Sequence, residues 1–239
     1  MYKEYFNYVI EHKKNVFKEC INMSKTLPKH KGHMKYRLMI LTHAFTHDLS
    51  KFRPSEFIPY AEYFYEWHGV RLEGAYSEEQ ITNGMSCLSR NYLECKNNFE
   101  EAWELHYKRN KHHPEYWDGK KIPYIYILQM ICDLKAMSRK FGGTAQEYYL
   151  RNYHEWNLNR DSRYSLEVIL DLIAKYNAPI CEGNEEYWMT IEELIKYEED
   201  YLKNNTTGSY KNTESYINDL LKPACEKYNV NIYELVKKA

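Results

Sequence analysis

Ten histidines are the residues of this sequence best suited to chemistry, and two of them lie where apolar residues recur at helical spacing. His12 follows Val9 by three positions and precedes Val16 by four, so on a helix the three residues share one face. His106 follows Trp103 by three positions in the same way. The spacing therefore predicts that both imidazole rings point toward the interior of the protein.

Two aspartates occur in comparable settings. Asp133 lies three positions after Met130 and four before Met137, within the most apolar predicted helix. A carboxylate on an apolar face must be paired, hydrogen-bonded or bound to a metal. The pair His47-Asp48 ends another predicted helix, where a carboxylate is unfavourable against the helix dipole. Both aspartates are therefore candidates for binding a metal.

Imidazole and carboxylate groups without thiolates are typical ligands of a hydrolytic metal centre. Such a mixed set suits Mn, Fe, Zn, Ni or Mg and does not suit a structural zinc site. The six cysteines are scattered singly and form no Cys-x-x-Cys pair, so we expect reduced thiols. A bundle of helices can aim ligands of this kind at one central point.

The elements that must position these groups are predicted to be helices, and the fold class is all-α. Glycine and proline are scarce, at 9 and 7 of 239 residues, which disfavours a loop-rich β-barrel or sandwich. Helices are predicted over residues 2–23, 34–48, 54–67, 99–110, 124–141, 166–176, 190–203 and 213–228.

Local signals mark where several of these helices begin and end. Ser77 is a helix N-cap after a loop over residues 69–76, and residues 204–211 form a polar loop. Gly142 and Gly143 end one helix, and Pro223 predicts a kink or a break in the helix over residues 213–228. Two capping boxes open helices, at residues 144–147 and 190–193.

The order of the candidate ligands resembles the H…HD…D signature of HD-domain phosphohydrolases. His12 comes first, His47-Asp48 follow, and Asp133 lies on a later predicted helix. The segment His47-Asp48-Leu49-Ser50-Lys51 is similar to the HD-x-(G/S)-K form of that signature. The resemblance covers roughly residues 5 to 155 and implies an HD-domain-like helical bundle with additional C-terminal helices.

A second stretch resembles the HD-GYP branch of these phosphohydrolases. Residues 112–119 look like its HHE…DG run, Ile122-Pro123 like its IP pair, and residues 133–136 like its D…A element. The GYP tripeptide itself is absent because Lys120 and Lys121 follow Gly119, which argues against hydrolysis of cyclic-di-GMP. The overall pattern looks closer to an uncharacterised HD-like family of bacteria and their phages.

The resemblance implies metal-assisted hydrolysis of a phosphate ester. One divalent ion would be held by His12, His47, Asp48 and Asp133, and would activate a water molecule. We therefore expect an enzyme, either a phosphomonoesterase or a phosphodiesterase, that acts on a nucleotide or a similar small phosphate ester.

Further residues are assigned roles by the same resemblance. His106, His112 and His113 would hold a second ion or contact the phosphate, and Lys51 would offer a positive charge to it. The adjacent rings of His112 and His113 would point apart on regular structure. Asp48 and Lys51 are the expected catalytic residues. The expected metal ligands are His12, His47, Asp48, His106, His112, His113 and Asp133.

The other histidines are more simply interpreted as core or surface residues. His43 precedes His47 by four positions, which is a known metal spacing, but a core or supporting role is favoured. The remaining four are expected to be hydrogen-bonded core or surface residues: His30, His33, His68 and His154.

Charge and segment composition set expectations about partners and location. The net charge of −1 gives no electrostatic case for binding nucleic acid. No apolar run is long enough for a membrane helix, and the charged N-terminus lacks a secretory signal, so a cytoplasmic location is expected. Residues 1–157 are predicted to form the HD-like metal-binding domain, and residues 158–239 a C-terminal helical extension packed on it.

Two other functions stay open at this point, as does the oligomeric state. The protein could be a non-catalytic HD-like ligand-binding or regulatory module, or a helical protein that binds nucleic acid or another protein. The 25 tyrosines bear on the choice, because a tyrosine suits the wall of a polar cavity. We expect a group of them around the metal pocket: Tyr5, Tyr8, Tyr60, Tyr63, Tyr107, Tyr116, Tyr124 and Tyr126.

Overall fold

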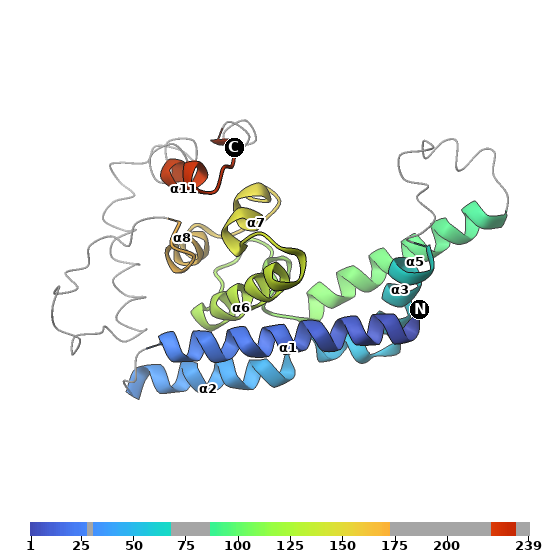
Figure 1. Cartoon of the computed structure of the whole chain (residues 1–239), viewed down its shortest axis with the longest axis horizontal. Helices are drawn as coiled ribbons and strands as arrows, with labels where there is room; N and C mark the ends of the chain where they lie inside the picture. Colours follow the sequence, from blue (N-terminus) through green and yellow to red (C-terminus); the bar gives the residue numbers. More distant parts are fainter. Residues whose placement is uncertain (28–30, 68–86, 173–220, 233–239) are drawn as a thin grey trace. The chain divides into compact units, whose positions relative to one another are not determined.

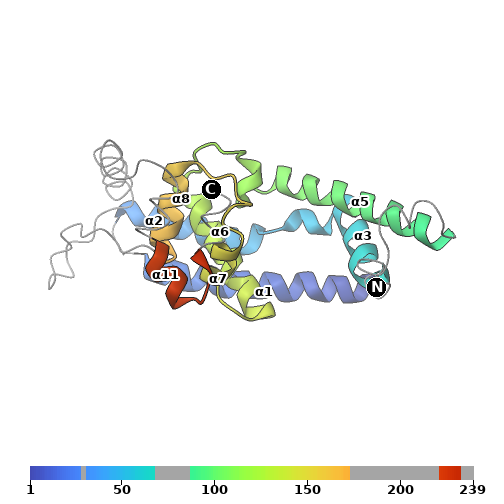
Figure 2. The ribbon, with the colours of Figure 1, turned by 90° about the horizontal axis from the view of Figure 1, so that it is seen from above.

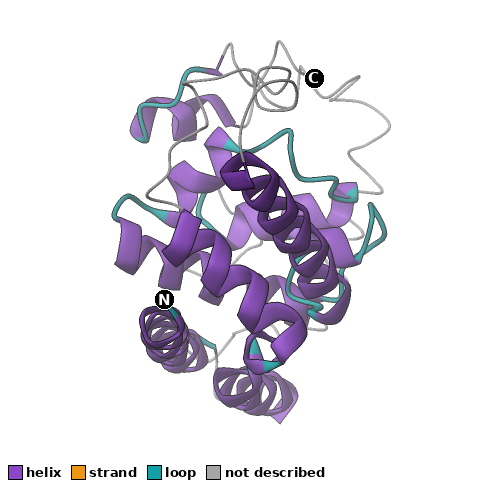
Figure 3. Ribbon diagram, turned by 90° about the vertical axis from the view of Figure 1, so that its right-hand side faces the viewer, coloured by secondary structure: helices purple, strands orange, loops and turns teal. Residues whose placement is uncertain are grey.

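The computed structural model describes residues 1–27, 31–67, 87–172 and 221–232, which Figure 1 draws as coloured ribbon. Within these ranges the regular structure is helical and contains no strand (Figure 3). The predicted all-α class is therefore confirmed. No helix in this part of the chain is both long enough and apolar enough to cross a bilayer.

The described helices are of three kinds. The α-helices are α1 (Tyr2–Thr26), α2 (Lys31–Thr46), α3 (Pro54–Glu62), α5 (Cys87–Arg109), α6 (Tyr124–Phe141), α7 (Ala145–Arg151), α8 (Arg160–Ile169) and α11 (Lys222–Lys227). Short 3-10 helices are η1 (Leu49–Phe52) and η3 (Pro114–Tyr116), and η2 (Tyr63–Trp67) is a π-helical turn that continues α3.

Local sequence signals account for the boundary between α6 and α7. Helix α6 has the predicted bounds and ends at Gly142 and Gly143, whose φ angles of 80° and 73° favour glycine. The predicted capping box opens α7: the Thr144 hydroxyl accepts from the Glu147 amide at 3.1 Å, and the Glu147 carboxylate accepts from the Thr144 amide at 2.9 Å. These two bonds satisfy donors that a helix start leaves open.

Several predicted boundaries differ from the structure, including that of α2, which ends at Thr46 and leaves His47 and Asp48 beyond the helix. Helix α5 begins at Cys87, well before the predicted start at Phe99. Helix α8 spans Arg160–Ile169 instead of 166–176, because the Asn159 side chain caps it by accepting from the Asp161 amide at 3.0 Å. Pro223 lies in the first turn of α11, where a missing N–H is tolerated, and residues 213–220 of the helix predicted to kink or break there lie outside the described residues.

Other predicted elements lie outside the described residues. They are the loop at 69–76, the helix start at Ser77, the capping box at 190–193 with its helix, and the loop at 204–211.

The chain forms two compact units, each with its own core. The first unit comprises Met1–Lys14 and Thr46–Lys111, and the second comprises Asn15–Phe45 and His112–Ala239. The predicted domain boundary between residues 157 and 158 stays a prediction.

Aromatic residues build the first unit. Helices α3 and α5 lie side by side (Figures 1 and 2). Tyr60 of α3 packs edge-on against Phe99 of α5, with ring centroids 5.0 Å apart, and is stacked on Trp103 at 6.0 Å. The buried residues of this core are Tyr5, Val9, Tyr60, Ala61 and Ala102. The packing fixes α5 against α3 and against the first turns of α1.

Helix α6 is central to the second unit. Its residues Ile127, Leu128 and Ile131 are almost completely buried, and α7 and α8 pack against it. In the same unit, residues 15–26 of α1 run alongside α2 (Figure 1), where Phe17 and Phe45 meet edge-on at 5.4 Å. The core continues through α11 by way of Ala224 and Cys225.

Candidate metal centre

Helix α1 carries His12 into the first unit. The ring is 2 % exposed and shares its face with Val9, which is fully buried. This confirms the orientation predicted from their spacing of three residues. The next side chain, Lys13, reaches the end of α2, where its ammonium donates to the carbonyl oxygen of His47 at 2.5 Å.

The backbone leaves the helical conformation at Asp48, shortly after the end of α2. Asp48 has φ 51° and ψ 29°, in the left-handed region that aspartate and asparagine enter more readily than most residues. The Lys51 amide then donates to the Asp48 carbonyl at 3.0 Å, which begins η1. The turn buries the side chains of both His47 and Asp48, each 1 % exposed.

Three buried side chains thus bring their ligand atoms together in the first unit. His12 Nε2 and His47 Nε2 are 2.9 Å apart. Asp48 Oδ2 lies 3.4 Å from His47 Nε2 and 4.0 Å from His12 Nε2. Two ligand atoms that are each ~2.1 Å from one ion lie ~3 to ~4.2 Å apart, depending on the angle between them. The separations match that range, so the three residues could hold a metal ion.

Lys51 lies against the same carboxylate oxygen. Its ammonium is 2.7 Å from Asp48 Oδ2, and its side chain is 14 % exposed. Burial by itself lowers the pKa of Lys51, but the Asp48 charge more than offsets this, and the net pKa is well above its ordinary value. The ammonium is therefore a permanent positive charge beside the candidate ligands.

Two of the predicted wall tyrosines line this region. The Lys51 ammonium lies over the ring of Tyr60, 6.0 Å from its centroid, and Tyr5 packs on Tyr60 at 5.9 Å. Burial raises the pKa of both phenols, so both keep their protons. Other predicted wall residues lie elsewhere: Tyr116 is 37 % exposed, and Tyr124 packs on the core of the second unit.

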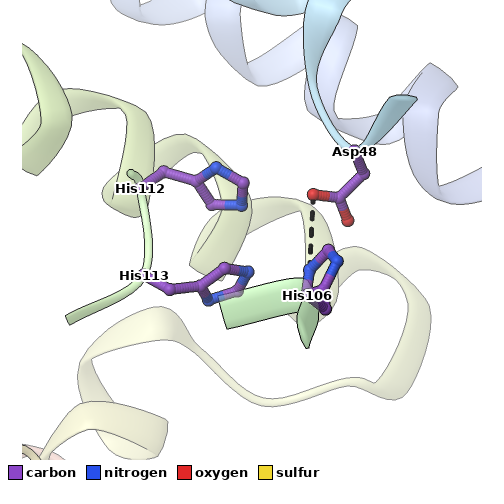
Figure 4. Close-up of side chains that lie close together, drawn as sticks. All are labelled: Asp48, His106, His112 and His113. Atoms are coloured by element: carbon purple, nitrogen blue, oxygen red, sulfur yellow. Dashed lines mark ion pairs between the residues drawn. The ribbon is translucent and has the colours of Figure 1, made fainter. Parts of the chain in front are cut away.

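His106, on α5, approaches Asp48 from the other side of the carboxylate. Its Nε2 lies 3.6 Å from Asp48 Oδ1 (Figure 4). The ring is 2 % exposed, as predicted, although Trp103, which was expected to share its buried face, is 39 % exposed. Its Nδ1 lies 2.9 Å from Glu56 Oε2 on α3. His106 therefore joins the buried group of the first unit.

Glu56 is the functional candidate that sequence reasoning missed. The side chain is completely buried. Burial by itself raises the pKa of Glu56, but hydrogen bonds from His106, Arg109 and Ser50 outweigh it and lower the pKa below the ordinary value. In the sequence, Glu56 is recognisable only as an acidic residue in the first turn of the helix that begins at Pro54. No spacing rule links it to a histidine fifty positions later.

The other predicted ligands lie in the second unit. His112 Nε2 is 3.8 Å from Asp133 Oδ2, and the rings of His43 and His112 meet edge-on at 5.3 Å. His43 and His112 are buried, whereas the Asp133 side chain is 17 % exposed. The parts predicted for Asp133, His112 and His113 in the metal centre stay predictions.

His112 and His113 do not point apart as expected for regular structure. Their ring centroids are 4.2 Å apart (Figure 4). The reason is that His113 has extended backbone, with φ −94° and ψ 136°, directly before η3. Of the histidines expected in core or surface positions, His33 is buried and His154 half-buried, and His30 and His68 lie outside the described residues.

Comparison with known proteins identifies the family of this chain. No curated protein and no solved structure matches the chain significantly. One family does match, over residues 1–172, a range that includes every described residue of the first unit and all the candidate ligands. The chain therefore belongs to DUF5662, a family of unknown function.

Proposed function

We propose that this protein is a metal-dependent phosphohydrolase that cleaves a phosphate ester of a nucleotide or a similar small molecule. The observation that carries the proposal is the buried trio His12, His47 and Asp48, whose ligand atoms all lie within 4.8 Å of one another. The order of these residues along the chain, which resembles that of HD-domain phosphohydrolases, supports the same class of reaction.

The trio would hold a divalent ion. Two imidazoles and one carboxylate suit Mn, Fe, Zn, Ni or Mg, and Asp48 contributes the negative charge of the set. When bound, the ion supplies Lewis acidity toward a phosphoryl oxygen and lowers the pKa of a water molecule. The burial of all three side chains excludes bulk water, which strengthens every electrostatic interaction among them.

Lys51 would bind the phosphate of the substrate. Its ammonium is already held beside the ligand atoms by Asp48, at 2.7 Å, and remains charged at neutral pH. The ring of Tyr60 covers one side of it. A phosphate oxygen that approaches the trio would therefore meet a fixed positive charge at little cost in reorganisation.

Metal content is the first measurement, because it tests the ligands without a guess about substrate. We expect elemental analysis of the purified protein to find a divalent transition metal. With Mn²⁺ added, we expect turnover of a member of a panel of nucleoside mono-, di- and triphosphates, cyclic dinucleotides and p-nitrophenyl phosphate.

Asp48→Asn tests the role of the Asp48 carboxylate, because it removes the negative charge and keeps the size of the side chain. Asparagine tolerates the left-handed backbone of Asp48, whereas alanine would add strain there. Asp171→Asn is a matched control, because Asp171 is exposed and has φ 58°. We expect turnover to be lost in the first variant and kept in the second.

Three outcomes would contradict the proposal. If turnover is unchanged in Asp48→Asn, the group His12, His47 and Asp48 does not take part in catalysis. Metal binding with ligand-induced thermal stabilisation but no product would indicate a ligand-binding or regulatory module. A protein that binds no metal, yet binds nucleic acid or another protein, would indicate a helical interaction protein.

A further inference from the structure

The hydrogen bonds around Glu56 form a network that includes His106, Ser50, Arg109 and Asn110. Arg109 donates to Glu56 Oε1 at 2.6 Å, and Ser50 donates to Oε2 at 2.8 Å. Asn110 donates to the His106 carbonyl oxygen at 2.7 Å and to Ser50 Oγ at 3.0 Å. The network joins η1, α3 and the end of α5, all within the first unit.

The orientation of the Asn110 amide follows from this geometry. If the amide were turned over, its oxygen would face the His106 carbonyl oxygen at 2.7 Å, and two acceptors would meet. The nitrogen therefore lies there, and one of its hydrogens goes to the His106 carbonyl. Its other hydrogen lies near two atoms, Ser50 Oγ at 3.0 Å and His106 Nδ1 at 3.1 Å. Of the contacts to His106 Nδ1, the one with Glu56 Oε2 is the shortest, at 2.9 Å, and the one with Ser50 Oγ is longer, at 3.3 Å.

The same reasoning places a proton on His106. Glu56 is a carboxylate that already receives hydrogens from Arg109 and Ser50, so it can only accept at the 2.9 Å contact with His106 Nδ1. We infer that Glu56 is a positioning residue that keeps a proton on Nδ1 of His106 and so presents the opposite nitrogen, Nε2, to Asp48.

The consequence for the site is chemical. With the proton held on Nδ1, Nε2 is the ring atom able to coordinate a divalent cation or to carry an exchangeable proton, and it lies 3.6 Å from Asp48 Oδ1. A carboxylate behind a histidine ring fixes its orientation in many metal sites and raises its basicity. The catalytic meaning of the inference rests on the proposed function, whereas the proton position does not.

Nuclear magnetic resonance reads the proton position directly. The experiment uses metal-free, full-length protein labelled with ¹⁵N in histidine, at a pH of about 8, where an ordinary histidine is neutral. Long-range ¹H–¹⁵N correlation spectra report which ring nitrogen carries a proton, and a His106→Gln variant assigns the signals. We expect Nδ1 of His106 to be protonated. A ring that carries its only proton on Nε2 would overturn the inference.

Glu56→Gln is the sharpest perturbation, because the structure dictates how the new amide must sit. Arg109 only donates, so the amide oxygen must remain on its side, at the position of Oε1. The amide nitrogen then faces His106 Nδ1 and donates to it, which moves the ring proton to Nε2. We expect this exchange of tautomers in Glu56→Gln and an unchanged tautomer in Glu56→Asp, which keeps the carboxylate.

The matched control is Glu104→Gln on the same helix as His106, because Glu104 forms an exposed ion pair with Lys108. We expect no change of tautomer there. If Glu56→Gln does not fold, as judged by circular dichroism, the wild-type spectrum still decides the question. A folded Glu56→Gln protein with the proton still on Nδ1 would also contradict the inference.

Metal affinity separates this inference from the proposed function. Titration with Zn²⁺ should show affinity weaker by roughly ten- to a hundredfold in Glu56→Gln, the usual cost of losing such a supporting carboxylate. If the wild type binds no metal and hydrolyses nothing, the proposed function fails while the tautomer result stands. If metal and turnover are present but Nδ1 is unprotonated, the inference about Glu56 fails alone.

Discussion

Asp48→Asn should abolish tight metal binding, because Asp48 supplies the negative charge of the buried trio. The Asp48 carboxylate faces His47, His12 and Lys51 through Oδ2 and His106 through Oδ1. Counting Asp48 as −1, Lys51 as +1 and the rings as neutral, this group has no net charge in the wild type and a charge of +1 in the variant. A dication must then enter a positive site.

The size of the effect can be estimated from the distances. The farthest ligand nitrogen is 4.0 Å from Asp48 Oδ2, so an ion held by the trio lies within about that distance of the carboxylate. A dication and a unit negative charge at ~4 Å attract by ~2 kcal/mol even at the dielectric constant of water, and by more in a buried site. The dissociation constant should therefore rise at least ~30-fold.

Isothermal titration of Mn²⁺ or Zn²⁺ into metal-free protein measures this difference. Wild type, Asp48→Asn and the control Asp171→Asn are compared at one pH and one ionic strength. We expect the control to match the wild type. If Asp48→Asn binds the metal with wild-type affinity and stoichiometry, the carboxylate is not a ligand and the electrostatic reasoning about the trio is wrong.

Three further predictions concern stability. Asp48→Asn should lower the free energy of unfolding by roughly 3 kcal/mol, because it leaves the Lys51 ammonium without its carboxylate. The double variant Asp48→Asn/Lys51→Met should be more stable to urea than Asp48→Asn alone. If the two substitutions lower the free energy of unfolding additively, Asp48 and Lys51 do not interact. The folded-state pKa of Glu56 lies below the ordinary value of 4.5. The ionised carboxylate therefore stabilises the folded protein fully above pH 4.5, and this stabilisation is lost as the pH falls through the folded-state pKa. Glu56→Gln should therefore destabilise the protein at pH ~7 and much less at pH ~3, and an equal loss at both would exclude this linkage. Thr144→Ala should cost about 1 kcal/mol by removing the cap of α7, measured by thermal unfolding, and no loss would mean that the capping box is not stabilising.

Helical periodicity was enough to orient His12. It is buried as its spacing from Val9 predicts, because positions three apart on a helix share a face whatever the helix packs against. His106 is buried as well, but Trp103, three positions before it, is 39 % exposed, so that spacing does not explain the burial of His106. Asp133 was placed on an apolar face by the same rule, yet its side chain is 17 % exposed. Periodicity gives the direction of a side chain and does not give the depth of burial, which depends on the neighbouring elements.

Signals within a few residues also predicted the ends of helices well where they were present. The end of α6 follows from Gly142 and Gly143, and the start of α7 follows from the capping box at Thr144. The start of α8 was missed because the Asn159 cap precedes the apolar positions that were used to predict that helix. Short-range hydrogen bonds decide these boundaries, so a sequence can predict them whenever the capping residue is recognised.

The partners of the site residues were decided only by the tertiary structure. The backbone of Asp48 adopts a left-handed turn that aims its carboxylate at Lys51 and His106. Aspartate tolerates that conformation but does not require it, so the residue type alone does not predict the turn. Glu56 meets His106 because α3 packs against α5. The amino-acid sequence thus supplied the ligand types and the face each occupies. The contacts between elements far apart in the chain required the packing of whole helices, because such contacts depend on distances that no local spacing rule contains.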